Sequence, residues 1–322
     1  MTIEFARTVS VPRPWGVVGG SFPFTTDDDG VAIGEIRYER PGQPVSEPSL
    51  LLKILLTSQP LSIQVHPDDA YAQSIGLPSG KTEAWYVVSA AAGAKVAIGL
   101  NQQMTPEHFR ESVQDGSIST IVAWQPVSTG DVVSVPAGTI HAIGADLVIA
   151  EIQQRSDTTY RIFDHGRKRE LHVESALAVA NAGPMVVQAR PLALTDERTL
   201  LVSNTHFVFE RLRLASGTAW WLEAARETWL LVLGGLAHVG SSDVTTGDAI
   251  FAQSDRVNIN VGPDGLIALL AYSGVGGPIP HALQRITQAG SPDLKFDETM
   301  PEPSSFTAAT TGGGNQRKEI IR

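Results

Sequence analysis

Four side chains that can bind a divalent cation occur in three short segments of this chain. Gln64 and His66 are two residues apart in a segment expected to be a strand, where alternate residues share one face. Glu83 and His141, in two later segments, are expected to complete the site. An amide oxygen, two imidazoles and a carboxylate form a mixed nitrogen and oxygen ligand set. The sequence therefore predicts a metalloenzyme.

Each of these residues has a simpler interpretation when it is considered alone. An isolated histidine before a proline, such as His66, more often ends a strand and bonds to a turn carbonyl. Glu83 could form a surface ion pair with Lys81. His141 follows a Pro-Ala-Gly turn among small apolar residues, where an unpaired imidazole is costly to bury. A buried Gln64 also needs partners for its amide, so the four residues together favour metal binding.

The composition indicates a globular protein. The chain has 322 residues, 42% of them hydrophobic and 18% charged, which is enough for a sizeable core and two domains. Cysteine is absent, so a metal must be bound by nitrogen and oxygen ligands. A cytoplasmic location is expected, and the absence of cysteine is consistent with it without implying it. No signal peptide or apolar span is expected. The net charge of −10 argues against nucleic acid or membrane partners.

Short apolar runs, separated by Gly, Pro, Asp and Ser, predict an all-β sandwich or barrel. The expected strands are 50–57, 84–88, 95–100, 131–135, 147–151, 208–214, 228–233, 249–251 and 266–272. A helix is expected near 105–118, because Thr105 is suited to the N-cap and Pro106 to the first helical position. A second helix is expected over 170–180, with Leu171 on its apolar face.

A weak internal repeat indicates two domains. The segment 247–252 begins like 130–135, but the proline, glycine and histidine that follow the first copy are missing from the second. The expected organisation is a catalytic domain over 1–190 with a helical insertion near 105–118, a second domain without ligands over 191–274, and a flexible tail over 275–322.

Two motifs connect these residues to a known family. The spacing Gly130-(five)-Pro136-x-Gly138-(two)-His141 resembles the second motif of cupins, and Gln64-x-His66 with Glu83 resembles the first, with Gln in place of the first His. Together with Lys81-Thr82-Glu83 and the segment 156–161, the motifs resemble the type I mannose-6-phosphate isomerases, especially the short bacterial form with two cupin domains. The motifs run from Trp15 to Arg167, about half of the chain.

The resemblance implies a fold of two cupin-type β-sandwich or jelly-roll domains, and one Zn²⁺ per chain in the first of them. The residues that match the family's zinc ligands are Gln64, His66, Glu83 and His141. Those that match its catalytic groups are Arg161, Glu151 and Lys81. Those that match its substrate-binding groups are Ser62, Lys53 and Trp15, with Trp15 near the entrance.

Three of these positions also make sense from the residues alone. Lys53 interrupts an apolar strand, which suits a polar cavity, although its stem could also reach solvent at a strand edge. Arg161 suits contact with a phosphate or enediolate, or an ion pair with Asp157 or Asp164. Glu151 ends an apolar run and is either an inward carboxylate or an exposed strand residue.

The chain departs from the family pattern at two places. The family often has an acidic residue followed shortly by Trp, where this chain has Glu35-Ile36-Arg37-Tyr38. The common Arg-x-Tyr-Asp-Trp-Gly segment reads Arg161-Ile162-Phe163-Asp164-His165-Gly166. One wall of the pocket is therefore expected to differ.

The family implies a metal-dependent aldose–ketose isomerase that interconverts mannose 6-phosphate and fructose 6-phosphate through a cis-enediol. Glu151 is the first candidate for the base that moves the proton and Lys81 the second, with a phosphorylated hexose as the partner. One alternative is a cupin that binds a sugar phosphate without turnover. Another is a metal cupin oxygenase, although such enzymes use three protein ligands and open positions rather than four ligands.

Overall fold

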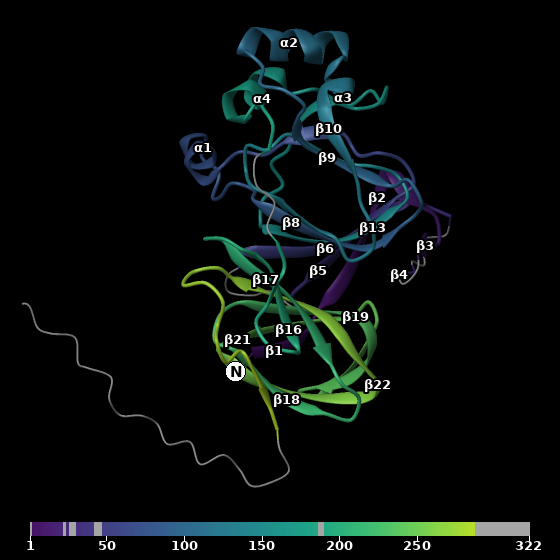
Figure 1. Cartoon of the computed structure of the whole chain (residues 1–322), viewed down its shortest axis with the longest axis vertical. Helices are drawn as coiled ribbons and strands as arrows, with labels where there is room; N and C mark the ends of the chain where they lie inside the picture. The colour runs from purple at the N-terminus through teal and green to yellow at the C-terminus, as the bar shows by residue number, and fades with distance from the viewer. Residues whose placement is uncertain (1, 22–23, 26–29, 42–46, 186–189, 287–322) are drawn as a thin grey trace, which may run out of the picture. The chain divides into compact units, whose positions relative to one another are not determined.

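The computed structural model describes residues 2–21, 24–25, 30–41, 47–185 and 190–286. Residues up to Ile286 form one compact unit. The flexible tail was predicted over 275–322, and its part after residue 286 lies outside the described residues. The predicted all-β fold is confirmed, because antiparallel sheets dominate and helices are few (Figure 1). No helix in the described ranges is long and apolar enough to cross a membrane.

Two sheets form a β-sandwich that we call the first sandwich. Its six-stranded sheet has the order β11 (Val132–Val135), β8 (Glu83–Ala90), β13 (Leu147–Gln154), β6 (Leu50–Thr57), β5 (Ile33–Glu39), β2 (Arg7–Val17). Its five-stranded sheet has the order β10 (Val122–Pro126), β9 (Lys95–Leu100), β12 (His141–Ile143), β7 (Ile63–Val65), β14 (Tyr160–Phe163). Apolar side chains from both sheets, such as Trp85, Ile149 and Ile98, pack in one core cluster. A short ribbon, β3 (Gly20–Ser21) with β4 (Phe24–Thr25), completes this part.

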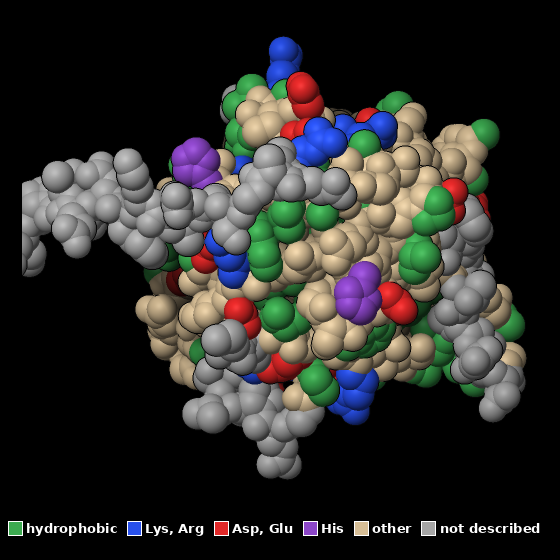
Figure 2. All heavy atoms as spheres, turned by 90° about the horizontal axis from the view of Figure 1, so that it is seen from below, with side chains coloured by type: hydrophobic (Ala, Val, Ile, Leu, Met, Phe, Trp, Pro, Cys, Tyr) green, Lys and Arg blue, Asp and Glu red, His purple; other side chains and the backbone are tan. Residues whose placement is uncertain are grey.

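The remaining strands form a ten-stranded antiparallel sheet. Its main path is β1 (Thr2–Phe5), β21 (Ala249–Gln253), β19 (Thr228–Val239), β22 (Asp255–Ser273), β17 (Phe207–Leu214), β16 (Arg198–Ser203), β15 (Leu192–Ala193). The strands beside this path are β18 (Ala219–Ala224), β20 (Ser242–Thr245) and β23 (Leu283–Arg285). The face seen in Figure 2 carries small, separate groups of apolar side chains between charged ones of both signs.

The six-stranded sheet is buried on both faces. One face contributes to the core of the first sandwich, and the other packs against the ten-stranded sheet, for example Leu52 and Ile54 in one cluster with Trp229 and Phe251. All eight residues of β6 are buried, which explains their nearly unbroken apolar sequence. Lys53 is therefore the exception in this strand.

The helices agree with the sequence in part. The helix predicted near 105–118 is confirmed as α2 (Pro106–Asp115) and α3 (Ile118–Ile121), and the Thr105 hydroxyl accepts a hydrogen bond from the His108 amide at 3.3 Å. A short α1 (Asp69–Ser74) was not predicted. The helix predicted over 170–180 is shorter, α4 (Val173–Val179). Leu171 precedes it and is exposed, so the predicted apolar face was wrong there, and Ala176 is the buried residue.

The division into domains at 190 and 274 stays a prediction. The strands from β2 to β14 make the first sandwich and its ribbon, and those from β15 onward belong to the ten-stranded sheet. The N-terminal β1 also belongs to that sheet, because it pairs with β21. The strands β22 and β23 continue the sheet to Arg285.

Candidate metal centre and its cavity

Three neighbouring strands of the five-stranded sheet bring together residues that are far apart in sequence. The central strand of the three is β7, and its Gln64 pairs with His141 of β12 on one side and with Arg161 of β14 on the other. Paired residues of adjacent strands present their side chains on the same face. Gln64 lies in β7 as predicted, whereas His66 directly follows the end of this strand.

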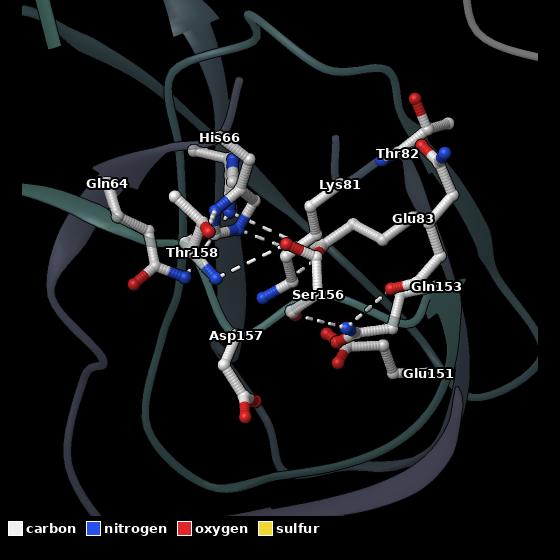
Figure 3. Close-up of polar contacts among 12 residues, drawn as sticks. Gln64, His66, Lys81, Thr82, Glu83, Glu151, Gln153, Ser156, Asp157 and Thr158 are labelled. Carbon is white, nitrogen blue, oxygen red and sulfur yellow. Dashed lines mark hydrogen bonds and ion pairs between the residues drawn. The ribbon is translucent and has the colours of Figure 1, made fainter. Parts of the chain in front are cut away.

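Glu83 reaches the two histidines from the opposite sheet, where it is the first residue of β8. Its Oε2 atom lies 3.5 Å from His66 Nε2, and its Oε1 atom lies 3.4 Å from His141 Nε2. All three side chains are buried, and their donor atoms lie within 4.8 Å of one another (Figure 3 shows His66 and Glu83). These three residues could hold a metal ion.

Backbone carbonyls orient both imidazoles. His66 Nδ1 lies 2.9 Å from the carbonyl oxygen of Thr158, and His141 Nδ1 lies 2.9 Å from that of Thr139. A carbonyl oxygen can only accept, so each Nδ1 carries a proton and donates it. In a neutral ring, Nε2 then has a free lone pair, and both Nε2 atoms point toward Glu83.

The electrostatics of this cluster fit a cation. Burial holds the pKa of His66 well below its usual value and lowers that of His141 to about 4, so both rings are neutral. Burial, followed by the charge of Glu151, raises the pKa of Glu83 to about 7. His66 Nε2 and Glu83 Oε2 are buried and have no hydrogen-bond partner. A divalent ion would satisfy both of these lone pairs, so the residues fit a metal site.

Gln64 lies beside this cluster with its amide nitrogen turned toward it. Gln64 Nε2 is 3.4 Å from His141 Nε2, and Gln64 Oε1 accepts a hydrogen bond from the Ser62 hydroxyl at 3.1 Å. Figure 3 shows Gln64 beside His66. A half-turn of the amide would exchange the two atoms and direct the oxygen toward the histidines. The structure thus places Gln64 within reach of the site, and its role as a ligand stays a proposal.

Two glycines let the loops approach closely enough to build the site. Gly138 adopts φ +83°, in the left-handed region, and its amide donates to the His66 carbonyl at 2.8 Å. A Cβ atom on Gly80 would lie 2.4 Å from the carbonyl carbon of Asp68, so only glycine fits before Lys81. These contacts fix the histidine-bearing turn and the start of β8 against the end of β7.

A cavity of about 290 Å³ adjoins the metal cluster. The predicted site residues that line it are Trp15, Lys53, Ser62, Gln64, Lys81, Glu151 and Arg161. The other lining residues, which were not predicted as site residues, are Arg13, Glu35, Leu55, Leu61, Asp157, Thr159 and Arg169. Trp15 is only 4% exposed, so it forms part of the wall rather than a free aromatic at the entrance.

A hydrogen-bonded network includes two of the lining residues, Lys53 and Glu151. Lys53 Nζ donates to Gln153 Oε1 at 2.6 Å and to Glu151 Oε1 at 3.3 Å. The indole Nε1 of Trp85 donates to Glu151 Oε2 at 3.2 Å and to Glu83 Oε1 at 3.1 Å. The network therefore connects Glu151 with the candidate metal ligand Glu83.

The simpler interpretations of single residues hold only in part in the structure. Lys53 lies in an inner strand of the six-stranded sheet rather than at an edge, and Glu151 is buried rather than exposed. Glu83 does contact Lys81, at 3.5 Å, but both side chains are buried. His66 does bond to a loop carbonyl, yet its other nitrogen faces Glu83.

Within the described part of the chain, Arg161 forms no ion pair with Asp157 or Asp164, which pair with Arg37 and with Arg167 instead. Its Nη1 atom donates to the Glu170 carbonyl at 2.9 Å, while its Nε atom is buried without a hydrogen-bond partner. Burial and the nearby charge of Arg169 lower the pKa of the guanidinium. An anion in the cavity could accept a hydrogen bond from this Nε atom and would favour the charged guanidinium.

The unpredicted wall of the cavity centres on Glu35. Its carboxylate accepts hydrogen bonds from Arg13 at 2.6 Å and from Arg37 at 3.0 Å. The departure from the family pattern at 35–38 therefore does fall on the pocket wall, as expected. The signal that could have identified Glu35 was its position between the apolar residues Ile33 and Ile36, in the strand next to the one that carries Lys53.

The fold and the ligand cluster define a cupin-like β protein with a candidate metal centre in its first sandwich. No family model matches the chain. Over 202 residues the chain is 39% identical to a mannose-6-phosphate isomerase of Streptococcus mutans, and the alignment covers 59% of this chain and 62% of that protein. The match thus spans less than two thirds of the relative's length.

Solved structures show the same fold over most of the chain. The crystal structure of the mannose 6-phosphate isomerase of Bacillus subtilis matches with a TM-score of 0.68 at 21% identity, over 84% of this chain and 99% of that one. A zinc-bound mannose 6-phosphate isomerase matches with a TM-score of 0.65 at 12% identity, over 85% of this chain and 100% of that one. The chain therefore has the fold of the mannose-6-phosphate isomerases, and the predicted resemblance to that family is confirmed.

Proposed function

We propose that this protein is a metal-dependent aldose–ketose isomerase that interconverts mannose 6-phosphate and fructose 6-phosphate. The observation that carries the proposal is the buried cluster of His66, Glu83 and His141 beside a cavity that contains Glu151 and Arg161. The relatives in both comparisons carry the name of this activity. A cytoplasmic location is part of the same proposal.

Zinc is the proposed metal, held by the three clustered residues with Gln64 as the fourth ligand after a half-turn of its amide. Neutral imidazole and carboxylate donors suit zinc, and one structural relative is described as zinc-bound. The C2 proton of an aldose is too weakly acidic to remove at neutral pH, and a bound zinc ion supplies polarisation of the sugar oxygens.

The protein groups divide the remaining work. Glu151 is the proposed base that moves one proton between C2 and C1, and the Lys53 ammonium lies 3.3 Å from its Oε1. Lys81 is the second candidate for this role. Arg161 stabilises the negative charge that develops on the cis-enediol, because its buried Nε has no other partner.

The cavity suits an anionic sugar. The cations that line it are Arg13, Lys53, Lys81, Arg161 and Arg169, and the carboxylates are Glu35, Glu151 and Asp157. This excess of positive charge contrasts with the net charge of −10 for the whole chain. Ser62, Lys53 and Trp15 are proposed to contact the sugar, since all three line the same cavity.

The test is a coupled isomerase assay of zinc-loaded protein with mannose 6-phosphate, with glucose 6-phosphate and free mannose as controls. We expect metal-dependent formation of fructose 6-phosphate and transfer of a deuteron from C2 to C1 of the labelled sugar. Complete absence of metal-dependent interconversion would refute the proposal. Binding of the sugar phosphate without turnover would support the non-catalytic alternative, and iron in the purified protein would support oxygen chemistry.

A further inference from the structure

A Glu-x-Trp pair occurs twice in the chain at equivalent places in the fold. Glu83 and Trp85 begin β8 in the first sandwich, and Glu227 and Trp229 stand at the start of β19 in the ten-stranded sheet. Both indoles are fully buried. Each donates its Nε1 hydrogen to the glutamate two residues earlier, at 3.1 Å in the first copy and at 3.4 Å in the second.

The two copies differ in what lies opposite the tryptophan. Trp85 pairs with Glu151 of the adjacent strand β13, and its Nε1 atom also donates to Glu151 Oε2 at 3.2 Å. Trp229 pairs with Ala271 of β22 in the corresponding place. One indole hydrogen is therefore shared by two carboxylates in the first copy, and the second copy has no carboxylate at the matching position.

We propose that Trp85 is a positioning residue that fixes the candidate metal ligand Glu83 and the proposed base Glu151 through this single shared hydrogen. This inference rests on the proposed function, because it assigns Glu151 to proton transfer. With one oxygen of each carboxylate held by Trp85, Glu83 directs its Oε2 atom toward His66, and Glu151 directs its Oε1 atom toward Lys53.

The shared hydrogen matters because both carboxylates are buried and carry like charges. Glu83 and Glu151 are both almost fully buried, and the indole N–H lies within hydrogen-bond distance of one oxygen of each. A hydrogen bond to a charged group that is removed from a buried site changes an equilibrium or a rate by about 10- to 100-fold. Losing the N–H should therefore displace Glu151 and weaken its proton transfer without removing any group that contacts the sugar.

The experiment compares Trp85→Phe with Trp229→Phe. Both variants lose a fully buried indole and its hydrogen bond to a preceding glutamate, so both report the effect of packing. We expect Trp85→Phe to lower kcat by about 10- to 100-fold with a much smaller change in KM, and to increase the primary isotope effect with C2-deuterated mannose 6-phosphate. Trp229→Phe should lose stability but keep kcat and the isotope effect.

Metal binding provides a readout that does not depend on turnover. Cobalt(II) bound in place of zinc should give a changed absorption spectrum in Trp85→Phe, because Glu83 loses its orienting donor, and an unchanged spectrum in Trp229→Phe. If Trp85→Phe fails to fold, replacement of Trp85 by benzothienylalanine removes only the N–H and keeps the ring shape.

Three results would overturn the inference: a kcat of Trp85→Phe close to that of the wild type, an equal loss in Trp229→Phe, or an unchanged isotope effect together with an unchanged cobalt spectrum. Failure of the proposed function is a different outcome, because the wild-type protein would then be inactive as well. In that case the cobalt spectra of the two variants still test whether Trp85 orients Glu83.

Discussion

Replacing Glu83 with Gln should move the stability of the metal-free and metal-bound protein in opposite directions. In the metal-free protein, the Glu83 carboxylate faces two imidazole lone pairs, and its pKa is raised from 4.5 to about 7. Because the pKa of Glu83 is raised on folding, its contribution to the free energy of unfolding is fully present below pH 4.5. This contribution falls by about 3 kcal/mol as the pH rises through about 7. Glutamine does not ionise, so Glu83→Gln avoids this loss.

The metal acts in the other direction. An ion that binds only the folded protein adds about 4 kcal/mol when its free concentration is about 1,000 times its Kd. Glu83→Gln removes the only carboxylate of the cluster and should remove this gain. Urea unfolding at about pH 8 should therefore rank wild type with zinc above Glu83→Gln, with or without zinc, and Glu83→Gln above chelated wild type by about 1–3 kcal/mol.

Two observations would refute this reasoning. One is a chelated Glu83→Gln protein that is less stable than chelated wild type at the same pH, since the carboxylate would then stabilise the metal-free site. The other is equal stabilisation of both proteins by zinc, since the metal would then bind elsewhere. A matched control is Glu39→Gln, because the Glu39 carboxylate takes part in an ion pair with Arg7 near the surface and is not near the cluster.

Further predictions concern other buried charges. His141→Ala should abolish zinc binding in isothermal titration, and full occupancy with full activity would refute the ligand set. Burial raises the pKa of Glu35, but neighbouring cations outweigh burial and lower it to about 2. The contribution of Glu35 to the free energy of unfolding is therefore present above pH 4.5 and is lost as the pH falls to about 2. At about pH 7, Glu35→Gln should be less stable than wild type by about 3 kcal/mol, and this difference should shrink in acid. A pH-independent difference would contradict this. Glu210→Ala leaves the buried Arg198 unpaired and should destabilise the protein by about 3–5 kcal/mol in urea, whereas a loss under about 1 kcal/mol would contradict the role of this pair.

The fold could be predicted because its strands are buried apolar runs separated by turn-forming residues. The run 50–57 is apolar throughout, and it is an inner strand buried on both faces. The helix near 106 was predictable because its cap and its proline are local signals. The helix over 170–180 was predicted too long because Leu171 is apolar but exposed, and burial of a single residue depends on distant packing.

The sequence predicted which residues form the site, but it did not predict the hydrogen bonds that connect them. Residue types and spacing identified the ligand candidates, and the structure places three of them together. Trp85 and Gln153 were missed, because an apolar ring and an amide in a strand show no sign of the partners they meet across the sheet.

The ten-stranded sheet contains the second Glu-x-Trp pair, and its glutamate has different partners from those of Glu83. Glu227, in the second Glu-x-Trp pair, accepts hydrogen bonds from the amide and hydroxyl of Ser49 and from the amide of Leu50, at 2.7–2.8 Å. These residues lead into β6, the strand that carries Lys53. A carboxylate at the start of the equivalent strand thus binds backbone N–H groups where Glu83 faces two imidazoles. Because those N–H groups lie at the start of β6, the carboxylate of the second copy stabilises the beginning of this strand through backbone hydrogen bonds and so contributes to the stability of the fold.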